Sequence, residues 1–198
     1  MAKGASAGNL ENAPGQALRQ AGMLAMLGGF LILLSAVSGF IGWRLPLALE
    51  AAPFFLCTTL VALTLTMPPS RGRTPVIACG MVGSILGLTS AFGEAVLGTP
   101  GRFMTLAYIA AFAGAALYGL SNRKPRHEVP RWAIYAGLSG AAFLILDGLL
   151  ADAGRPWSIL PVIVPAATWL TLGKTAILTE SMPAQAAPAG RGRPKGRR

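Results

Sequence analysis

The sequence predicts an all-α polytopic membrane protein with six transmembrane helices. Hydrophobic residues make up 53% of the 198-residue chain and form near-continuous runs of about 20 residues, the length that crosses a bilayer core as a helix. Charged residues make up only 12% of the chain, about half the share that is usual in soluble domains. Both observations exclude an ordinary soluble domain.

The six apolar runs are separated by polar or proline-rich breaks. They cover about residues 21–42, 47–67, 76–97, 103–120, 132–151 and 157–178. Very short turns alternate with longer basic loops, so we expect three tandem helical hairpins, over residues 21–67, 76–120 and 132–178. We expect residues 1–20 to form a flexible cytoplasmic arm and residues 179–198 a disordered basic cytoplasmic tail.

The first apolar run also contains a pattern that is typical of a cleaved secretory signal. The triplet Ala36-Val-Ser38 resembles a signal-peptidase site. The run is longer than the usual apolar region of a secretory signal, however, so we interpret it as an uncleaved first helix.

The basic residues predict the orientation of the chain. The side that holds both termini and the loops 68–75 and 121–131 would carry thirteen Lys and Arg residues. The opposite side would carry three, namely Arg44, Arg102 and Arg155. Because cytoplasmic loops are enriched in Lys and Arg, we expect a multi-pass protein of the bacterial inner membrane with both termini in the cytoplasm.

A spacing of small residues and arginines recurs in the three hairpins. Each copy has two small residues four positions apart, and an arginine follows the second of them by fifteen residues. The small pairs are Ala25 and Gly29, Gly83 and Gly87, and Ala136 and Gly140. Small residues four apart allow transmembrane helices to approach closely, so these six residues are predicted to serve helix packing within an internal repeat.

Two carboxylates continue the same helix faces. Glu94 and Asp147 each precede their turn arginine by eight residues, whereas the first copy has Ala36 there. We expect both side chains to point into the bundle, as charges in membrane segments nearly always do. Two interpretations stay open. Glu94 and Asp147 are proton- or cation-handling groups, or they form ion pairs with Arg102 and Arg155 that stabilise the hairpins.

Other polar or helix-breaking residues in the runs are few. Glu50 follows the first turn and is predicted to pair with Arg44. Pro53, Pro161 and Pro165 are predicted to kink their helices and to free backbone carbonyls. Such breaks form ion sites in some transporters and only shape packing in other membrane proteins.

No catalytic, metal or cofactor site is predicted. Gly137-Leu-Ser-Gly140 resembles the nucleophile motif of rhomboid intramembrane proteases, which activate the serine with a histidine on a later helix. The single histidine, His127, precedes this segment, so Ser139 lacks its base. One histidine also excludes a bis-histidine haem and a multi-histidine metal site. We therefore expect a protein that is not an enzyme.

The basic tail allows two interpretations. Residues 191–195 resemble the core of an AT-hook, which places arginines in the minor groove of A·T-rich DNA. The alternative, which we favour, is attraction to anionic lipid head groups at the cytoplasmic face, at about 1 kcal/mol per basic residue. The residues concerned are Arg191, Arg193, Lys195, Arg197 and Arg198.

The three hairpins, with small-residue helices and Pro/Gly turns, resemble the HdeD-like acid-resistance membrane protein family. The best local likeness runs from Thr74 to Ser121, with the turn at Pro100 and the segment Ile109-Ala-Ala-Phe112-Ala-Gly114. The resemblance implies an inner-membrane protein of bacterial stress tolerance, and it carries over no catalytic residues.

Two classes of function follow from these observations. The first is a non-enzymatic integral membrane protein of stress-response, assembly or accessory-subunit type, which acts with a membrane-protein partner or as a homo-oligomer. The alternative is a small proton- or cation-coupled transporter or channel that uses Glu94 and Asp147.

Overall fold

The computed structural model describes residues 13–43, 45–67, 69, 71–97, 103–123, 128–150 and 155–181, and all regular structure among them is helical. The helices are α2 (Ala13–Ile41), α3 (Pro46–Thr64), α4 (Arg73–Phe92), the π-helix η1 (Gly93–Leu97), α5 (Met104–Ser121), α6 (Glu128–Leu150) and α7 (Arg155–Ser181). Six of these helices are long and apolar enough to cross a membrane. The predicted all-α membrane class is therefore confirmed.

The first helix begins earlier than the hydropathy indicates. α2 starts at Ala13, eight residues before the first apolar run, and Ala17 in its second turn is buried. Just after this segment, Gly22 of α2 packs against Gly173 and Ile177 of α7. The first candidate membrane span accordingly runs from Gly15 to Ile41, and the helix begins within the segment that was predicted to be a flexible arm.

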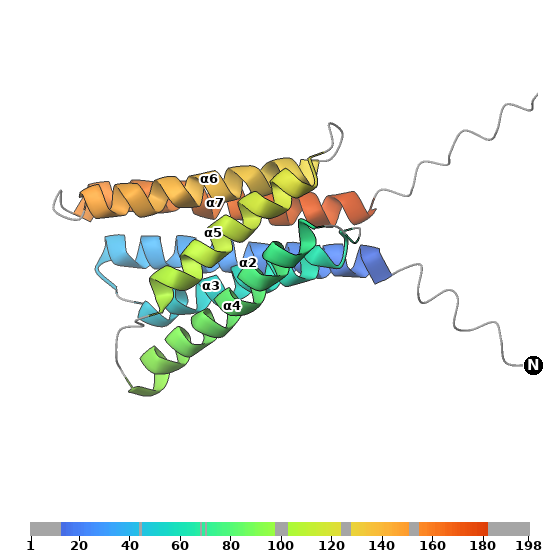
Figure 1. Ribbon diagram of the computed structural model, residues 1–198. Coiled ribbons are helices and arrows are strands. Elements are labelled where there is room, and N and C mark those ends of the chain that lie inside the picture. Colours follow the sequence, from blue (N-terminus) through green and yellow to red (C-terminus); the bar gives the residue numbers. More distant parts are fainter. Residues whose placement is uncertain are drawn as a thin grey trace, which may run out of the picture.

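The six helices form a closed ring. Each helix contacts its neighbours in the sequence, and α2 at the start of the chain also contacts α7 at its end (Figure 1). α3 makes a further contact with α5, so α4 lies towards the outside of the ring at that point. Of the six membrane spans, α4 is the least buried and α3 the most.

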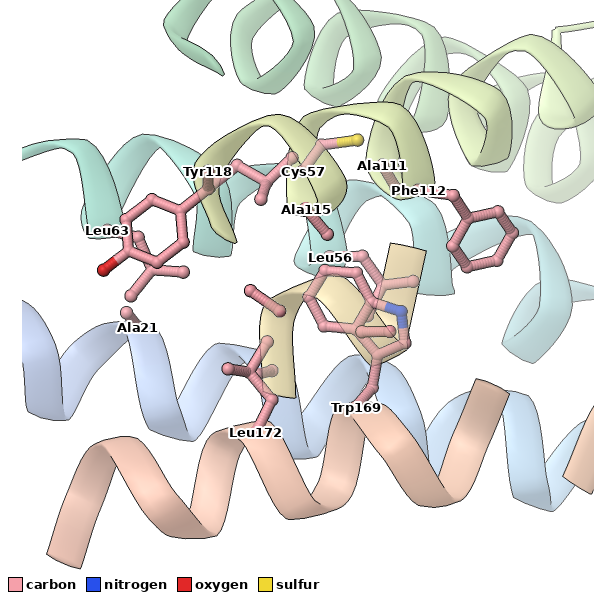
Figure 2. Close-up of a cluster of buried hydrophobic side chains, with 14 of the residues drawn as sticks. Ala21, Leu56, Cys57, Leu63, Ala111, Phe112, Ala115, Tyr118, Trp169 and Leu172 are labelled. Carbon is pink, nitrogen blue, oxygen red and sulfur yellow. The ribbon is translucent and has the colours of Figure 1, made fainter. Parts of the chain in front are cut away.

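The interior of the ring is filled by apolar side chains. Trp169 of α7 is fully buried, and it lies near Leu56 of α3 and Ala115 of α5 (Figure 2). Leu60 and Leu172 are also buried in this core. Since side chains from helices around the ring meet at its centre, the described part of the bundle is a packed core at this depth.

The prolines lie inside continuous helices. Pro53 is within α3, and Pro161 and Pro165 are within α7. Thr168 Oγ1 donates to the Pro165 carbonyl oxygen at 2.9 Å. The hydroxyl thus binds backbone near a break in the helix hydrogen bonds, as is usual for threonine in membrane helices.

Three contacts between hairpins are lined by glycine, and we call them the seams: α2 with α7, α4 with α3, and α6 with α5. A Cβ atom at Gly29 would lie 3.0 Å from the Ala166 oxygen on α7. A Cβ at Gly87 would lie 2.7 Å from the Phe54 nitrogen on α3, and one at Gly140 would overlap the Phe112 ring on α5. Each glycine of the predicted repeat thus faces the second helix of another hairpin.

The three seams share one register. Phe54 and Phe112 each follow their turn arginine by ten residues, and Ala166 follows Arg155 by eleven. The glycines that face them are equivalent in the sequence repeat. The seams are therefore built the same way to within one residue along the helix.

Candidate functional site

The six predicted packing residues all lie buried in the seams. Ala25 is 1% exposed and Ala136 is fully buried, and the four glycines of the set are buried as well. The structure adds a third small residue to each set, seven positions before the second residue of the pair. These additional residues are Gly22, Gly80 and Ala133, and all three are buried. The spacing of seven residues is present in the sequence of all three copies.

The two predicted carboxylates lie near helix ends. Glu94 belongs to η1, and Asp147 lies in the last turn of α6, at the end of the bundle where α3, α5 and α7 begin. Their side chains and that of Arg155 lie outside the described residues, as does all of Arg102. The basic tail from Arg191 to Arg198 also lies outside them. The ion pairs, the proton site and the lipid-binding tail thus stay predictions.

A different carboxylate is described in detail. Glu50, in the second turn of α3, is 7% exposed, and Ser90 Oγ of α4 donates a hydrogen bond to its Oε2. Ser90 is itself 1% exposed. Tyr108 of α5 is also buried, and its hydroxyl reaches the backbone of Leu49, the residue before Glu50. We call Glu50, Ser90 and Tyr108 the Glu50 cluster.

Tyr108 is held in place by two contacts. Its hydroxyl donates to the Leu49 carbonyl oxygen at 2.9 Å. Its ring stacks on Phe112 one turn later, with centroids 5.7 Å apart and an interplanar angle of 21°. The cluster therefore joins α3, α4 and α5 where α3 and α5 contact each other.

The Glu50 cluster occurs in one seam out of three. Glu50 follows Arg44 by six residues, and the residues at the same distance from Arg102 and Arg155 are Tyr108 and Pro161. The positions equivalent to Ser90, three residues after the glycine, hold Ile32 and Phe143. Among these equivalent positions of the predicted repeat, a carboxylate with a hydroxyl partner occurs only at Glu50 and Ser90. The sequence predicted Arg44 as the partner of Glu50, and Arg44 lies outside the described residues.

A π-helix adjoins the cluster. η1 begins at Gly93, three residues after Ser90, and its residues contact α3 as well as continuing α4. π-helical turns account for well under about 1% of residues in proteins and are frequent at functional sites. Glu94 lies within this turn, so the backbone that carries it runs beside the helix that carries Glu50.

The same seam holds a second hydroxyl contact between helices. Thr58 Oγ1 and Ser84 Oγ lie 3.2 Å apart between α3 and α4. Ser139 Oγ and Thr168 Oγ1 lie 2.9 Å apart between α6 and α7, which places Ser139 in a helix contact. No group of three His, Cys, Asp or Glu residues that could hold a metal occurs in the part of the chain that the structure describes.

The chain matches no protein-family model, and neither the curated proteins nor the solved structures include a significant match. The likeness to the HdeD-like family is therefore an expectation from the sequence alone. The fold and the Glu50 cluster are the observations on which a function can be argued.

Proposed function

We propose that this protein is a non-enzymatic integral membrane protein that acts by association within the bilayer, as a stress-response, assembly or accessory subunit. One observation carries the proposal. The centre of the ring is filled by apolar side chains around Trp169, and glycine packs the helices of each seam closely together. A bundle packed in this way suits a rigid membrane platform better than a pathway for ions.

The location we propose is the bacterial inner membrane, with both termini in the cytoplasm. The distribution of Lys and Arg in the sequence supports this orientation. The start of α2 and the end of α7 lie at one end of the bundle, as this orientation requires (Figure 1). A cysteine introduced at Thr99 should then react with an impermeant thiol reagent only from outside the cell, and labelling only from the cytoplasmic side would overturn the orientation.

The matched seams support an internal repeat of three hairpins. Glycines at equivalent positions face equivalent stretches of the neighbouring hairpin, including the seam between the last and the first hairpin. A repeat that closes on itself buries the small-residue face of every copy, which agrees with the way repeats stabilise one another.

The experiment that tests the proposed role combines reconstitution with purification. The purified protein in liposomes should carry no proton or cation flux, and chemical cross-linking in native membranes should give one defined complex, either a homo-oligomer or a complex with one partner protein. A protein that is monomeric in its own membrane, together with measurable flux, would overturn the proposal.

A second candidate is a small proton- or cation-coupled transporter that uses Glu94 and Asp147. The observation in its favour is the π-turn at Glu94, since irregular membrane helices often carry ion sites. It predicts flux in liposomes that is lost in both Glu94→Gln and Asp147→Asn, while both variants keep the thermal stability of the parent. Absence of flux in the parent protein excludes this candidate.

A further inference from the structure

Three arginines lie where α4 begins and α5 ends, at the end of the bundle that also holds the start of α2 and the end of α7 (Figure 1). Arg71 and Arg73 flank Gly72, the residue before α4, and Arg123 follows the end of α5 by two residues. A Cβ at Gly72 would lie 2.7 Å from the Cβ of Ser121, so the start of α4 packs directly against the last residue of α5. We call Arg71, Arg73 and Arg123 the arginine cluster.

Hydrogen bonds to one tyrosine fix the backbone around this cluster. The backbone nitrogen and Nδ2 of Asn122 both donate to the Tyr118 carbonyl oxygen, at 3.1 and 3.0 Å, and thereby cap α5 next to Arg123. The Tyr118 hydroxyl lies 3.4 Å from Thr66 Oγ1, in the segment that leads from α3 to α4. The ends of the two helices are therefore held together by specific contacts.

The start of α4 is strongly positive. Its first turn contains no acidic residue, and no side chain caps its N-terminus. The helix dipole already places positive partial charge there, so arginines at this position are unfavourable unless an anion is near. Among the side chains that the structure describes at this end of the bundle, the carboxylate is that of Glu128, which belongs to α6 and lies three residues before Arg131.

Arg73 has a donor that the described residues leave without an acceptor. Its side chain is partly buried, and its Nε is fully buried with no hydrogen-bond partner. A buried donor without an acceptor is costly, and more so when the donor is charged. The guanidinium groups of Arg71 and Arg123 are exposed beside it. Three positive side chains and an uncapped helix start thus indicate an anion as their partner.

The position of the cluster favours a membrane lipid as the source of this anion. The candidate membrane span of α4 begins at Arg73, and that of α5 ends at Ser121, so the arginines lie at the boundary of the apolar region. Further into the membrane, Met81 and Val82 of α4 are each 54% exposed, and Leu120 of α5 is 57% exposed. An anion that carries acyl chains contacts both the arginines and these apolar side chains, whereas a free anion contacts the arginines alone.

From this placement we propose that the arginine cluster binds the phosphate group of one anionic membrane lipid, whose acyl chains lie along the exposed apolar side chains of α4 and α5. Arginine suits this role because its planar fork of N–H donors matches the oxygens of a phosphate. Basic sites between membrane helices are a known way to bind lipid head groups. The site is separate from the basic tail and goes beyond the proposed association role.

The test is native mass spectrometry of the full-length protein in non-ionic micelles, titrated with phosphatidylglycerol. Phosphatidylcholine with the same acyl chains is the control lipid. We expect the first phosphatidylglycerol to bind about tenfold more tightly than phosphatidylcholine, the effect of hydrogen bonds to a charged group. Arg73→Gln should weaken this first binding step about tenfold, because it removes a guanidinium that donates to the phosphate.

Matched variants separate the site from net charge. Arg71→Gln and Arg123→Gln change exposed side chains and should also weaken the first step, whether or not Arg73→Gln folds well. Arg19→Gln on α2 and Arg131→Gln on α6 remove a charge at the same end of the bundle and should keep the parent affinity. Arg131 is a suitable control because its Nε already donates to the Tyr135 hydroxyl, at 3.1 Å.

Several outcomes would overturn the proposal. They are equal binding of the two lipids, a first step that none of the three cluster variants weakens, and an equal loss in Arg131→Gln or Arg19→Gln, which would mean that net charge alone attracts the lipid. Displacement of phosphatidylglycerol by an equal concentration of inorganic phosphate would assign the cluster to a free anion instead. Because none of these measurements involves flux or complex formation, failure of the lipid site is distinguishable from failure of the proposed role.

Discussion

Two seams of the ring are built on the same glycine register but differ in polarity. In the seam between α2 and α7, Gly22, Gly29 and Gly173 bring the two backbones together, and the described hydroxyl groups of both helices bind carbonyls of their own helix. In the seam between α3 and α4, glycine packing is accompanied by hydrogen bonds between helices, from Ser90 to Glu50 and between Thr58 and Ser84.

The two seams therefore share close glycine packing and differ in hydrogen bonds between their helices. Apolar helices gain no hydrophobic driving force from association in lipid, so close packing of backbones is a main source of their attraction. A hydrogen bond between membrane helices contributes about 0.6 kcal/mol on average. Among the described residues, close glycine packing is common to both seams, and the hydrogen bonds from Ser90 to Glu50 and between Thr58 and Ser84 are an addition in the seam between α3 and α4.

Of the substitutions compared below, the largest effect is expected at Gly87, where glycine meets the backbone of α3. A Cβ in Gly87→Ala would lie 2.7 Å from the Phe54 nitrogen and 3.0 Å from its Cα, and backbone atoms cannot move aside without separating α3 from α4. We expect a loss of about 2–3 kcal/mol in the free energy of unfolding, the upper range for overpacking, measured by denaturant titration in mixed micelles.

The matched control is Gly39→Ala in α2, where a Cβ would meet nothing within 4 Å. Alanine is the better helix former there, so the protein should gain about 0.5–1 kcal/mol. Equal effects of the two substitutions would mean that the seam is not closely packed.

The next effect comes from the Glu50 cluster. Ser90→Ala removes the hydroxyl that donates to the Glu50 carboxylate and should cost about 1.5 kcal/mol, the lower value for hydrogen bonds to charged groups. Thermal unfolding in detergent at neutral pH measures it. No loss of stability would show that Glu50 is satisfied without Ser90.

A smaller loss of stability is expected for Gly29→Ala, in the seam between α2 and α7. A Cβ in Gly29→Ala would lie 3.0 Å from the Ala166 oxygen and 3.1 Å from the Leu170 nitrogen, so a shift of a few tenths of an ångström relieves the contact. We expect about 1 kcal/mol, the low end for overpacking. A loss larger than that of Gly87→Ala, measured in the same titration, would contradict the order of these two positions.

The smallest effect is expected for Ser84→Ala. Thr58 Oγ1 lies 3.2 Å from Ser84 Oγ but also donates to the Phe54 carbonyl oxygen at 2.7 Å, so it keeps a partner in the variant. The loss should be about 0.6 kcal/mol, the average for such contacts in membranes. A loss as large as that of Ser90→Ala would show that the hydroxyl pair, and not the carboxylate, sets the strength of this seam.

Hydropathy predicted the six helices but not which helices touch. It reports how long a segment stays apolar, so it predicts the spans, whereas α2 begins at Ala13, before the first apolar run. The small pairs predicted close packing, but the repeat could not say that Gly29 faces α7 rather than α3. The ring is closed by contact between the first helix, α2, and the last helix, α7. Such a contact leaves no local signal in the sequence.

The Glu50 cluster illustrates the same limit for sites. Glu50, Ser90 and Tyr108 are separated by 40 and 18 residues along the chain, and only the packing of α3, α4 and α5 brings them together. Glu94 and Asp147 are the carboxylates that the sequence pattern indicates, because they repeat. Glu50 does not repeat, and its lack of an equivalent in the other hairpins becomes informative only once the seams are aligned.

The most direct test of the ring is a disulfide across the seam between the first and last helices. In a chain that carries Cys57→Ala and Cys79→Ala, Gly22→Cys is combined with Ile177→Cys, since a Cβ at Gly22 would lie 2.7 Å from Ile177 Cγ1. Oxidation in native membranes should give an intramolecular disulfide at high yield, whereas the control pair of Gly22→Cys with Leu120→Cys on α5 should give none. Equal yields from the two pairs, or no disulfide from the first, would contradict a closed ring.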